Sequence, residues 1–298
     1  MTMARRHLSI VIIFGIAALL SSCAPAKQVL DGSFLPVEGI VNARDLGGYM
    51  TADSLVVKSG LLMRGASLAT AKDADLALLS KLHTVKVIDF RTEFEKKGNE
   101  DKLLPEATYV SLPVTTADSS DASAKMKSIK SVNISKLIVF AAFNEKAQKR
   151  ARELYPSLVM RPDCQRQFAA FLREVVDTHD GAVFFHCILG KDRTGFAAAY
   201  LLSALGVDRE TIIADFDKTN LVYGDEVVKA CRKVKSLGGK EEELAVVKVF
   251  VGANKDNFIK ALDLIDAEYG SMDAYLRGPL GLTDADIETL RARYLTRH

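Results

Sequence analysis

The stretch that decides the fold is AVFFHCILGKDRTGFAAAYLLSALG, which runs from Ala182 to Gly206. Its first five letters form a short apolar run, which predicts a buried β-strand. The letters from Thr194 to Leu205 are apolar almost all round, which predicts a buried helix that stops at Gly206. Strands and helices alternate elsewhere in the chain, so we expect an α/β layer fold with a mixed or parallel central sheet.

The loop between this strand and this helix predicts an anion site that carries a nucleophile. A run of backbone amides leading into a helix N-terminus binds anions, and Gly190 lets the loop turn tightly. The helix N-terminus and nearby cations favour the thiolate form of Cys187, which is the nucleophilic form. Arg193 follows Cys187 after five intervening residues and can offer its planar guanidinium to two phosphoryl oxygens. These residue types in this order indicate phosphoryl chemistry.

Three neighbours of these residues have supporting roles in this interpretation. The hydroxyl of Thr194 can donate a hydrogen bond to the sulfur, and His186 is expected to brace the loop through hydrogen bonds to the backbone. Lys191 adds positive charge that suits substrates with extra phosphates. The alternative for Lys191 is a side chain that points into solvent.

Two aspartates are candidates for the general acid that protonates the leaving oxygen. Asp192 lies within the loop, and its alternative role is an ion pair with Arg193 or Lys191. Asp89 ends a predicted buried strand, and its alternative role is a structural carboxylate that binds loop amides or Arg91. A general acid must come within about 3 Å of the leaving oxygen, directly or through one water. The sequence leaves both candidates open.

The segment HCILGKDRTG, residues 186–195, resembles the signature loop of cysteine-dependent protein tyrosine phosphatases, in their bacterial tyrosine and dual-specificity subgroup. Further segments resemble the same subgroup in the same order along the chain. They are VNARDLGGY at 41–49, VIDFRTEFE at 87–95, GVDRETIIADFDKTN at 206–220 and YGSMDAYLRGPLGLTDADIETLRARYL at 269–295. Ala43 and Phe90 depart from the usual residues conservatively.

This resemblance implies a fold, a reaction and a set of site residues. The fold would be an α/β fold with a protein-tyrosine-phosphatase-like central mixed sheet flanked by helices, with a helical lid insertion. The reaction would be phosphomonoester hydrolysis through a phosphocysteine, without a metal or other cofactor, on phosphotyrosine and by extension on other phosphoproteins or phosphoinositides. The implied catalytic residues are Cys187, Arg193, Asp192, Asp89 and Thr194, and the implied phosphate-binding residues are Ile188, Leu189, Gly190, Lys191 and Arg193.

Other classes of protein share part of this pattern. Rhodanese-like sulfurtransferases and arsenate reductases also place an arginine after a cysteine and five residues, but the preceding histidine, the following Thr-Gly and the flanking matches argue against them. The remaining alternative is a non-catalytic phosphoryl-binding lipoprotein. The intact set of Cys187, Arg193 and Thr194 argues against this alternative.

The N-terminus is expected to be a targeting segment. Residues 1–22 combine a basic start with a short apolar run, which is typical of an export signal and too short to span a bilayer. Cys23 follows the small residues LSS and resembles the lipidated cysteine of bacterial lipoproteins, so we expect an exported protein that is lipid-anchored to a bacterial membrane. In a Gram-negative host, Ala24 is compatible with the outer membrane or the cell surface. The alternative is a plain secretory signal with an incidental Cys23.

Composition bounds the rest of the interpretation. The 298 residues carry a net charge of +2, which gives no general attraction to nucleic acid, and the four cysteines lack zinc-ligand spacing. We expect a tether at 23–36 and one catalytic domain at 37–298. Within that domain, a Ser- and Lys-rich stretch and a basic helix at about 115–155 read either as a solvated surface insertion or as a lid over the site. Oligomeric state is left open.

Three helices have clear local signals. Phe168, Phe171, Leu172, Val175 and Val176 mark one face of an amphipathic helix. Two further helices are expected to begin with capping boxes. Their cap pairs are Thr70 with Asp73 and Thr283 with Asp286.

Overall fold

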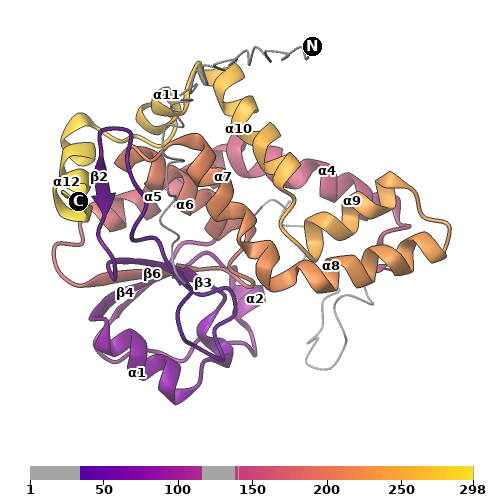
Figure 1. The fold of residues 1–298 in the computed structure, drawn as a ribbon, viewed down its shortest axis with the longest axis horizontal. Coiled ribbons are helices and arrows are strands. Elements are labelled where there is room, and N and C mark those ends of the chain that lie inside the picture. The colour runs from indigo at the N-terminus through magenta and orange to yellow at the C-terminus, as the bar shows by residue number, and fades with distance from the viewer. Residues whose placement is uncertain (1–33, 116–137, 140, 298) are drawn as a thin grey trace, which may run out of the picture.

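The computed structural model describes residues 34–115, 138–139 and 141–297 (Figure 1). The predicted signal at 1–22, Cys23, tether residues 24–33 and insertion residues 116–137 and 140 lie outside the described residues. Residues 34–36 of the predicted tether lie against the domain, where Phe34 bridges Arg44 and the amide of Leu35 donates to Ala43 O at 3.0 Å. Among the described residues, no helix is both long and apolar enough to cross a membrane.

Strands and helices alternate in the middle of the chain, between residues 62 and 186, and helices alone then follow as far as residue 294. The strands are β1 (Arg44–Asp45), β2 (Leu55–Val57), β3 (Leu62–Gly65), β4 (Thr84–Asp89), β5 (Thr108–Ser111), β6 (Ala182–His186) and β7 (Leu295–Arg297). The helices are α1 (Asp73–Lys81), α2 (Glu93–Lys96), α4 (Glu145–Met160), α5 (Pro162–Val176), α6 (Asp192–Leu205), α7 (Arg209–Asp217), α8 (Thr219–Ser236), α9 (Glu241–Phe250), α10 (Lys255–Tyr269), α11 (Met272–Arg277) and α12 (Asp284–Tyr294).

The central sheet has five strands in the order β1-β3-β6-β4-β5. The pairs β3–β6, β6–β4 and β4–β5 are parallel, whereas edge strand β1 is antiparallel to β3. The register places His186 beside both Gly65 and Asp89. The carboxyl ends of three neighbouring strands therefore meet where the loop after β6 begins. The predicted mixed sheet flanked by helices is confirmed.

Strand β6 is buried on both faces because helices cover both sides of the sheet (Figure 1). Val183 and Phe185 belong to the main apolar core, which includes α5 and α6. Ala182 and Phe184 belong to a second cluster on the other side, which includes Leu79 of α1. This two-sided burial explains why the strand reads as a continuous apolar run and not as an alternating one.

Helices α5 and α6 confirm the predictions from their sequence patterns. All five apolar residues that mark one face of α5 are buried. Helix α6 is buried along most of its length and ends where Gly206 adopts a left-handed conformation with φ of 89°. Burial of α6 against the sheet fixes the helix N-terminus, and with it the loop that precedes it.

The two predicted capping boxes differ in outcome. At the start of α12, Thr283 and Asp286 form the predicted box, with the Thr283 amide donating to Asp286 at 2.9 Å. The prediction for Thr70 and Asp73 is wrong, because the hydroxyl of Thr70 donates to Gly39 O at 2.8 Å and helix α1 begins only at Asp73.

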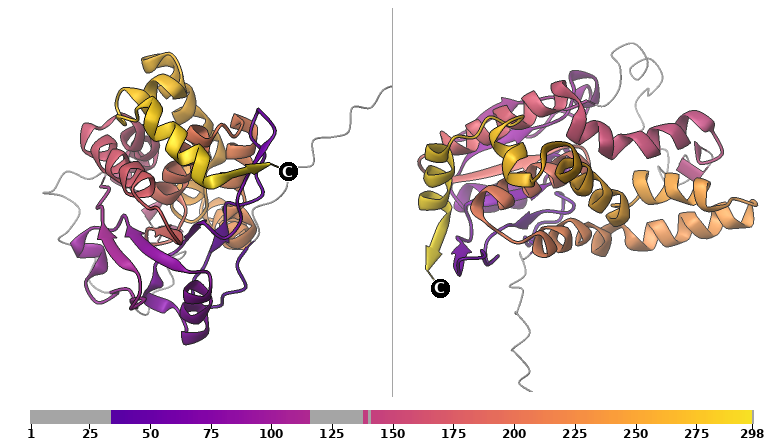
Figure 2. Two further views of the ribbon diagram at one scale, coloured as in Figure 1. Left: turned by 90° about the vertical axis from the view of Figure 1, so that its left-hand side faces the viewer. Right: turned by 90° about the horizontal axis from the view of Figure 1, so that it is seen from above.

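Helices α4, α8 and α9 form an arm that extends away from the sheet (Figures 1 and 2). The arm has an apolar cluster of its own, separate from the main core. Its buried members are Val139, Ala142, Ala151, Ala230, Val234, Leu244, Val246, Val247, Val249 and Val251. The basic helix of the predicted insertion is the outer part of α4, so it packs in this arm. Its use as a lid stays a prediction.

Candidate active site

The loop from Cys187 to Lys191 joins the end of β6 to the N-terminus of α6. Its carbonyls are turned toward the protein, where Ile188 O accepts from the Ser67 amide at 3.2 Å. In the described part of the chain, no hydrogen bond is recorded from the backbone amides of 188–191. The loop therefore carries, directly after Cys187 in the chain, a row of amide donors that no described group uses, as an anion-binding nest does.

Side chains from distant elements hold the loop carbonyls. The Asn42 amide donates to Gly190 O at 2.8 Å, and the Tyr223 hydroxyl of α8 donates to Leu189 O at 3.1 Å. Asn42 precedes β1 and Tyr223 lies in the arm, so the loop is fixed from both sides. Neither residue was singled out from the sequence, although Asn42 belongs to the segment VNARDLGGY.

Gly190 is required by the geometry of the turn. Its φ is 64°, in the left-handed region. A Cβ at this position would lie 2.3 Å from the backbone C and O atoms of Gly65, at the end of β3. Any other residue would therefore displace the loop from the sheet.

Arg193 is held by a carboxylate that sequence reasoning missed. The Glu95 carboxylate accepts hydrogen bonds from both terminal nitrogens of the guanidinium, at 2.8 and 2.9 Å. Phe90 O accepts a further hydrogen bond from Nη1 at 3.1 Å. Burial disfavours the charge of Arg193, yet Cys187, Glu95 and Asp192 raise its pKa above the ordinary value. Glu95 thus orients the arginine, and its sequence signal is the capping box that it forms with Thr92 at the start of α2.

Lys191 is buried, which contradicts the solvent-facing alternative. Its ammonium donates to Val249 O at 2.7 Å and to Gly252 O at 2.6 Å, where α9 ends. Cations are favoured at helix C-termini because free carbonyls and the helix dipole face them. The predicted positive charge of Lys191 is therefore directed into the arm, while its backbone amide stays in the loop.

Asp192 stands at the first turn of α6 with its side chain 18% exposed. Its carboxylate accepts from the Tyr155 hydroxyl at 2.7 Å and lies 3.4 Å from the Lys191 ammonium. Asp192 is thus the candidate acid that keeps contact with solvent.

The hydroxyl of Thr194 is buried and has no hydrogen-bond partner among the described residues, so the predicted bond to the Cys187 sulfur is not formed in this structure.

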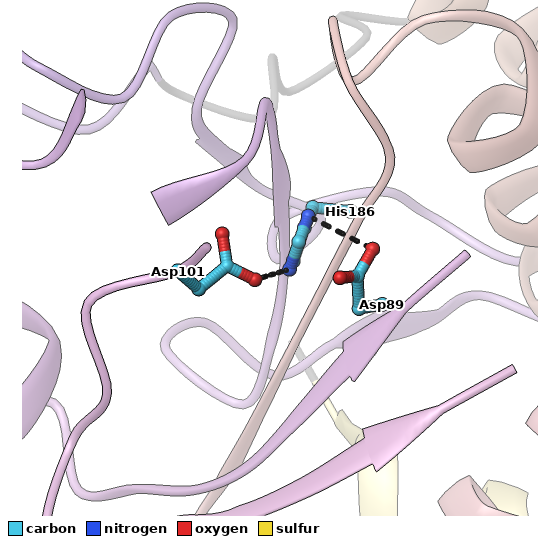
Figure 3. A group of neighbouring side chains, drawn as sticks. All are labelled: Asp89, Asp101 and His186. Carbon is cyan, nitrogen blue, oxygen red and sulfur yellow. Dashed lines mark ion pairs between the residues drawn. The ribbon is translucent and has the colours of Figure 1, made fainter. Parts of the chain in front are cut away.

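Asp89 lies in a fully buried ion network on the β4–β5 side of the loop (Figure 3). Arg91 donates to it through its backbone amide at 2.8 Å and its Nη2 at 2.8 Å, and Tyr109 donates at 2.5 Å. Burial opposes the charge of Asp89, yet Arg91, His186 and Tyr109 hold its pKa below the ordinary value. These contacts are those of the structural alternative, a carboxylate that binds Arg91.

His186 lies between two carboxylates of this network. Its Nε2 is 3.0 Å from Asp101 Oδ2 and its Nδ1 is 3.7 Å from Asp89 Oδ1, as Figure 3 shows. Nδ1 also lies 3.1 Å from Cys187 O, which agrees with the expected bracing of the loop. Asp101 was not identified from the sequence.

These three side chains are also close enough together to be considered as metal ligands, since their ligand atoms lie within 4.8 Å of one another. Arg91 already supplies a cation there, because its Nη2 lies 2.7 Å from Asp101 and 2.8 Å from Asp89. The donor set therefore fits an ion network around Arg91 better than a metal site.

Two other cysteines lie in the described part of the chain, and both are unpaired. Cys164 is buried in the main core, donates to Thr115 O at 3.3 Å, and burial raises its pKa to about 12. Cys231 is half-buried on α8. Cys164 fits the interpretation as a buried apolar residue.

The fold and the loop together define a class of protein. A cysteine at the end of a central strand, a row of free amides and an arginine in the first turn of the following helix are the parts of a cysteine-dependent phosphatase loop. The chain belongs to the tyrosine phosphatase family, whose model matches residues 35–296. It is a tyrosine-protein phosphatase family enzyme.

Two relatives cover nearly the whole chain. A Cupriavidus necator protein provisionally named a tyrosine-protein phosphatase is 32% identical over 275 residues, which is 91% of this chain and 92% of that one. A triple specificity protein phosphatase, PtpB of Mycobacterium tuberculosis, is 28% identical over 276 residues, which is 85% of this chain and 96% of that one.

Proposed function

We propose that the protein hydrolyses phosphomonoesters through a phosphocysteine at Cys187, with phosphotyrosine as its principal substrate. The observation that carries this proposal is the loop geometry. The amides of 188–191 donate to no described group of the protein, and Glu95 holds the guanidinium of Arg193 in the first turn of the helix that follows the loop. Donors fixed in advance stabilise charge that develops in a transition state, because they need no reorganisation during the reaction.

The reaction has two steps. The Cys187 thiolate attacks phosphorus, the bond to the ester oxygen breaks, and the leaving oxygen takes a proton from an acid. Water then attacks the phosphocysteine, gives its proton back to the same group and releases phosphate and the thiolate. Arg193 and the loop amides bind the phosphoryl oxygens in both steps.

Asp192 is the proposed acid. It lies at the first turn of α6, remains partly exposed and accepts one hydrogen bond from Tyr155. Asp89 is fully buried and its oxygens already accept from Arg91 and Tyr109. An acid has to reach the leaving oxygen directly or through one water, and the partly exposed position of Asp192 supports this role better than the buried position of Asp89.

Wider specificity is a second part of the proposal. The relative from Mycobacterium tuberculosis is named a triple specificity protein phosphatase, which supports activity on more than one class of phosphorylated substrate. Recognition of an additional phosphate by Lys191 would require its ammonium to leave Val249 O and Gly252 O. We therefore expect phosphotyrosine to be preferred over phosphoinositides.

Export and lipidation belong to the proposal as well. Residues 1–22 would direct export, and acylation of Cys23 would place the enzyme on a bacterial membrane, with phosphorylated proteins or lipids as its partners. Incorporation of labelled fatty acid into the wild-type chain and not into Cys23→Ser is the expected result. Equal labelling of both chains would contradict it.

The catalytic proposal is tested by hydrolysis of an aryl phosphate. The purified wild-type chain should release phosphate, and Cys187→Ser should fall to background while still binding a phosphotyrosine peptide. The conservative change keeps the loop and removes only the nucleophile. If wild type binds the peptide but releases no phosphate, the protein is the phosphoryl-binding alternative and the enzyme proposal fails.

The acid is tested with aryl phosphates that differ in leaving-group basicity. Asp192→Asn should lose about 100-fold in kcat with a basic leaving group and much less with p-nitrophenol, because a good leaving group needs no proton. Asp89→Asn serves as the comparison and should reduce stability with no such dependence. A leaving-group dependence in Asp89→Asn that is absent from Asp192→Asn would reverse the assignment.

A further inference from the structure

A second buried ion network lies beneath the loop, on its β1–β3 side. Arg44 and Arg64 are paired across these two strands and are both fully buried. Both bind Asp215 of α7, Arg44 through Nε at 2.9 Å and Arg64 through Nη1 at 2.7 Å. Two arginines against one carboxylate leave one positive charge in excess.

This excess charge persists at neutral pH. Burial opposes ionisation of Asp215, but Arg44 and Arg64 outweigh it and hold the pKa of Asp215 well below its ordinary value. Burial lowers the pKa of Arg64 to about 10, which still leaves the guanidinium protonated at pH 7. The network therefore carries a net cation inside the protein.

Arg64 connects this network to the loop. Its Nη2 donates to Gly190 O at 2.9 Å and to Lys191 O at 3.3 Å. Because both carbonyls point down to Arg64, the peptide groups of the loop are oriented with their amides on the side of the phosphoryl position. Among the described residues, Arg44 donates no hydrogen bond to the loop; its Nη1 donates to Asn42 Oδ1 at 2.6 Å.

Two cation–carboxylate pairs adjoin the loop, because Arg193 lies 2.8 Å from Glu95 and Lys191 lies 3.4 Å from Asp192. Each of these pairs is neutral. On the β4–β5 side, Asp89 and Asp101 bind Arg91 and contact His186, the residue before Cys187. The uncharged titratable groups that face this region are phenols whose pKa is raised by burial, namely Tyr49, Tyr155 and Tyr223.

We propose that Arg64 is a positioning residue for the nucleophile: it holds the carbonyls of Gly190 and Lys191 and supplies the excess positive charge that stabilises the thiolate of Cys187. It acts through the loop and touches no substrate. The thiolate of Cys187 makes the network neutral, whereas the thiol leaves a buried cation without compensation. The idea deepens the proposed function, in which Cys187 is the nucleophile.

The test follows the thiolate directly. The rate of alkylation of Cys187 by iodoacetamide is measured against pH for wild type, Arg64→Met and Arg64→Lys, with Cys187→Ser as the blank for the other thiols. Arg64→Met removes the charge and the two hydrogen bonds to the loop carbonyls. Arg64→Lys keeps the charge but lacks the planar guanidinium that binds both carbonyls at once. Circular dichroism and urea unfolding serve as the controls that each variant is folded.

Arg64→Met should move the alkylation midpoint upward by on the order of one pH unit, since removal of one buried positive charge beneath the loop weakens the stabilisation of a nearby anion by about that much. Arg64→Lys should keep the midpoint within about 0.3 pH unit of wild type and lower kcat for aryl phosphate, because a point charge does not orient two carbonyls. An unchanged midpoint in folded Arg64→Met overturns the proposal. If Arg64→Met does not fold, Arg64→Lys decides, and wild-type kcat in that variant overturns it.

These readouts separate the two proposals. Alkylation needs no phosphatase turnover, so a protein that hydrolyses nothing can still show the shift in Arg64→Met. Conversely, an active enzyme whose alkylation midpoint does not depend on Arg64 keeps its function and loses this positioning residue.

Discussion

Two buried ion networks flank the start of the loop, and their charges are unbalanced in opposite directions. On the β4–β5 side, Asp89 and Asp101 face Arg91, which leaves one negative charge in excess. On the β1–β3 side, two arginines face Asp215, which leaves one positive charge in excess.

The comparison shows that adjacent residues of the chain can lie beside buried networks of opposite net charge. His186 contacts the negative network through both of its ring nitrogens. Cys187 begins the loop whose carbonyls accept hydrogen bonds from Arg64 of the positive network. A buried charge without compensation is costly, so each network favours a group of opposite charge beside it.

The largest expected effect comes from removing the centre of the positive network. Asp215→Asn leaves Arg44 and Arg64 buried together without a carboxylate, and loss of one partner from a buried ion pair costs about 3–5 kcal/mol. Urea unfolding should show this loss in the free energy of unfolding. Asp53→Asn is the control, because the Asp53 side chain is 58% exposed where it pairs with Arg291, and exposed pairs contribute little to stability. Equal effects of both variants would contradict the buried network.

The second prediction concerns acid. The pKa values of Asp215 and Asp89 are held below their ordinary range by arginines, against the effect of burial. Stabilisation from such groups is complete above the unfolded value of about 3.9 and is lost as pH falls toward the folded pKa. The urea concentration at the unfolding midpoint of the wild type should therefore decrease as the pH is lowered below about 4. Asp215→Asn should show a shallower drop, because it lacks the contribution of that carboxylate. Parallel curves would argue that Asp215 is not ionised in the folded protein.

The smallest expected effect on the free energy of unfolding comes from removing one tyrosine hydroxyl from each network. Tyr109 donates to Asp89 at 2.5 Å, and Tyr49 donates to Asp215 at 3.0 Å. Tyr109→Phe and Tyr49→Phe each remove one hydrogen bond to a carboxylate, at about 1.5–3 kcal/mol. Tyr109→Phe should be the more destabilising, because Asp89, which accepts from Tyr109, belongs to the network with an excess of negative charge. The reverse order in urea unfolding would show that charge balance does not govern these contacts.

Local patterns predicted the central part of the fold. The run AVFFH and the apolar stretch after Thr194 are short-range signals, and β6 and α6 form where they predict. The cysteine and arginine of the loop were also identifiable, because the loop is continuous in sequence.

The supports of the loop were harder to predict, because they depend on contacts between distant segments. Glu95 meets Arg193 only after the sheet has formed, and Arg64 meets Gly190 in the same way. A charged residue in a sequence is usually exposed, so nothing local indicated that Arg64 is fully buried. The direction of Lys191 was missed because α9, which accepts its ammonium, lies far along the chain.

The contact between Gly190 and Gly65 has an evolutionary consequence. A Cβ at 190 would lie 2.3 Å from the backbone of Gly65, and a Cβ at 65 would lie 2.8 Å from the ring of Phe184. At Gly190 the obstacle is main chain, so a substitution cannot be tolerated by adjusting a rotamer, whereas at Gly65 the obstacle is the side chain of Phe184. Gly190 is therefore expected to persist in descendant sequences more strictly than Gly65.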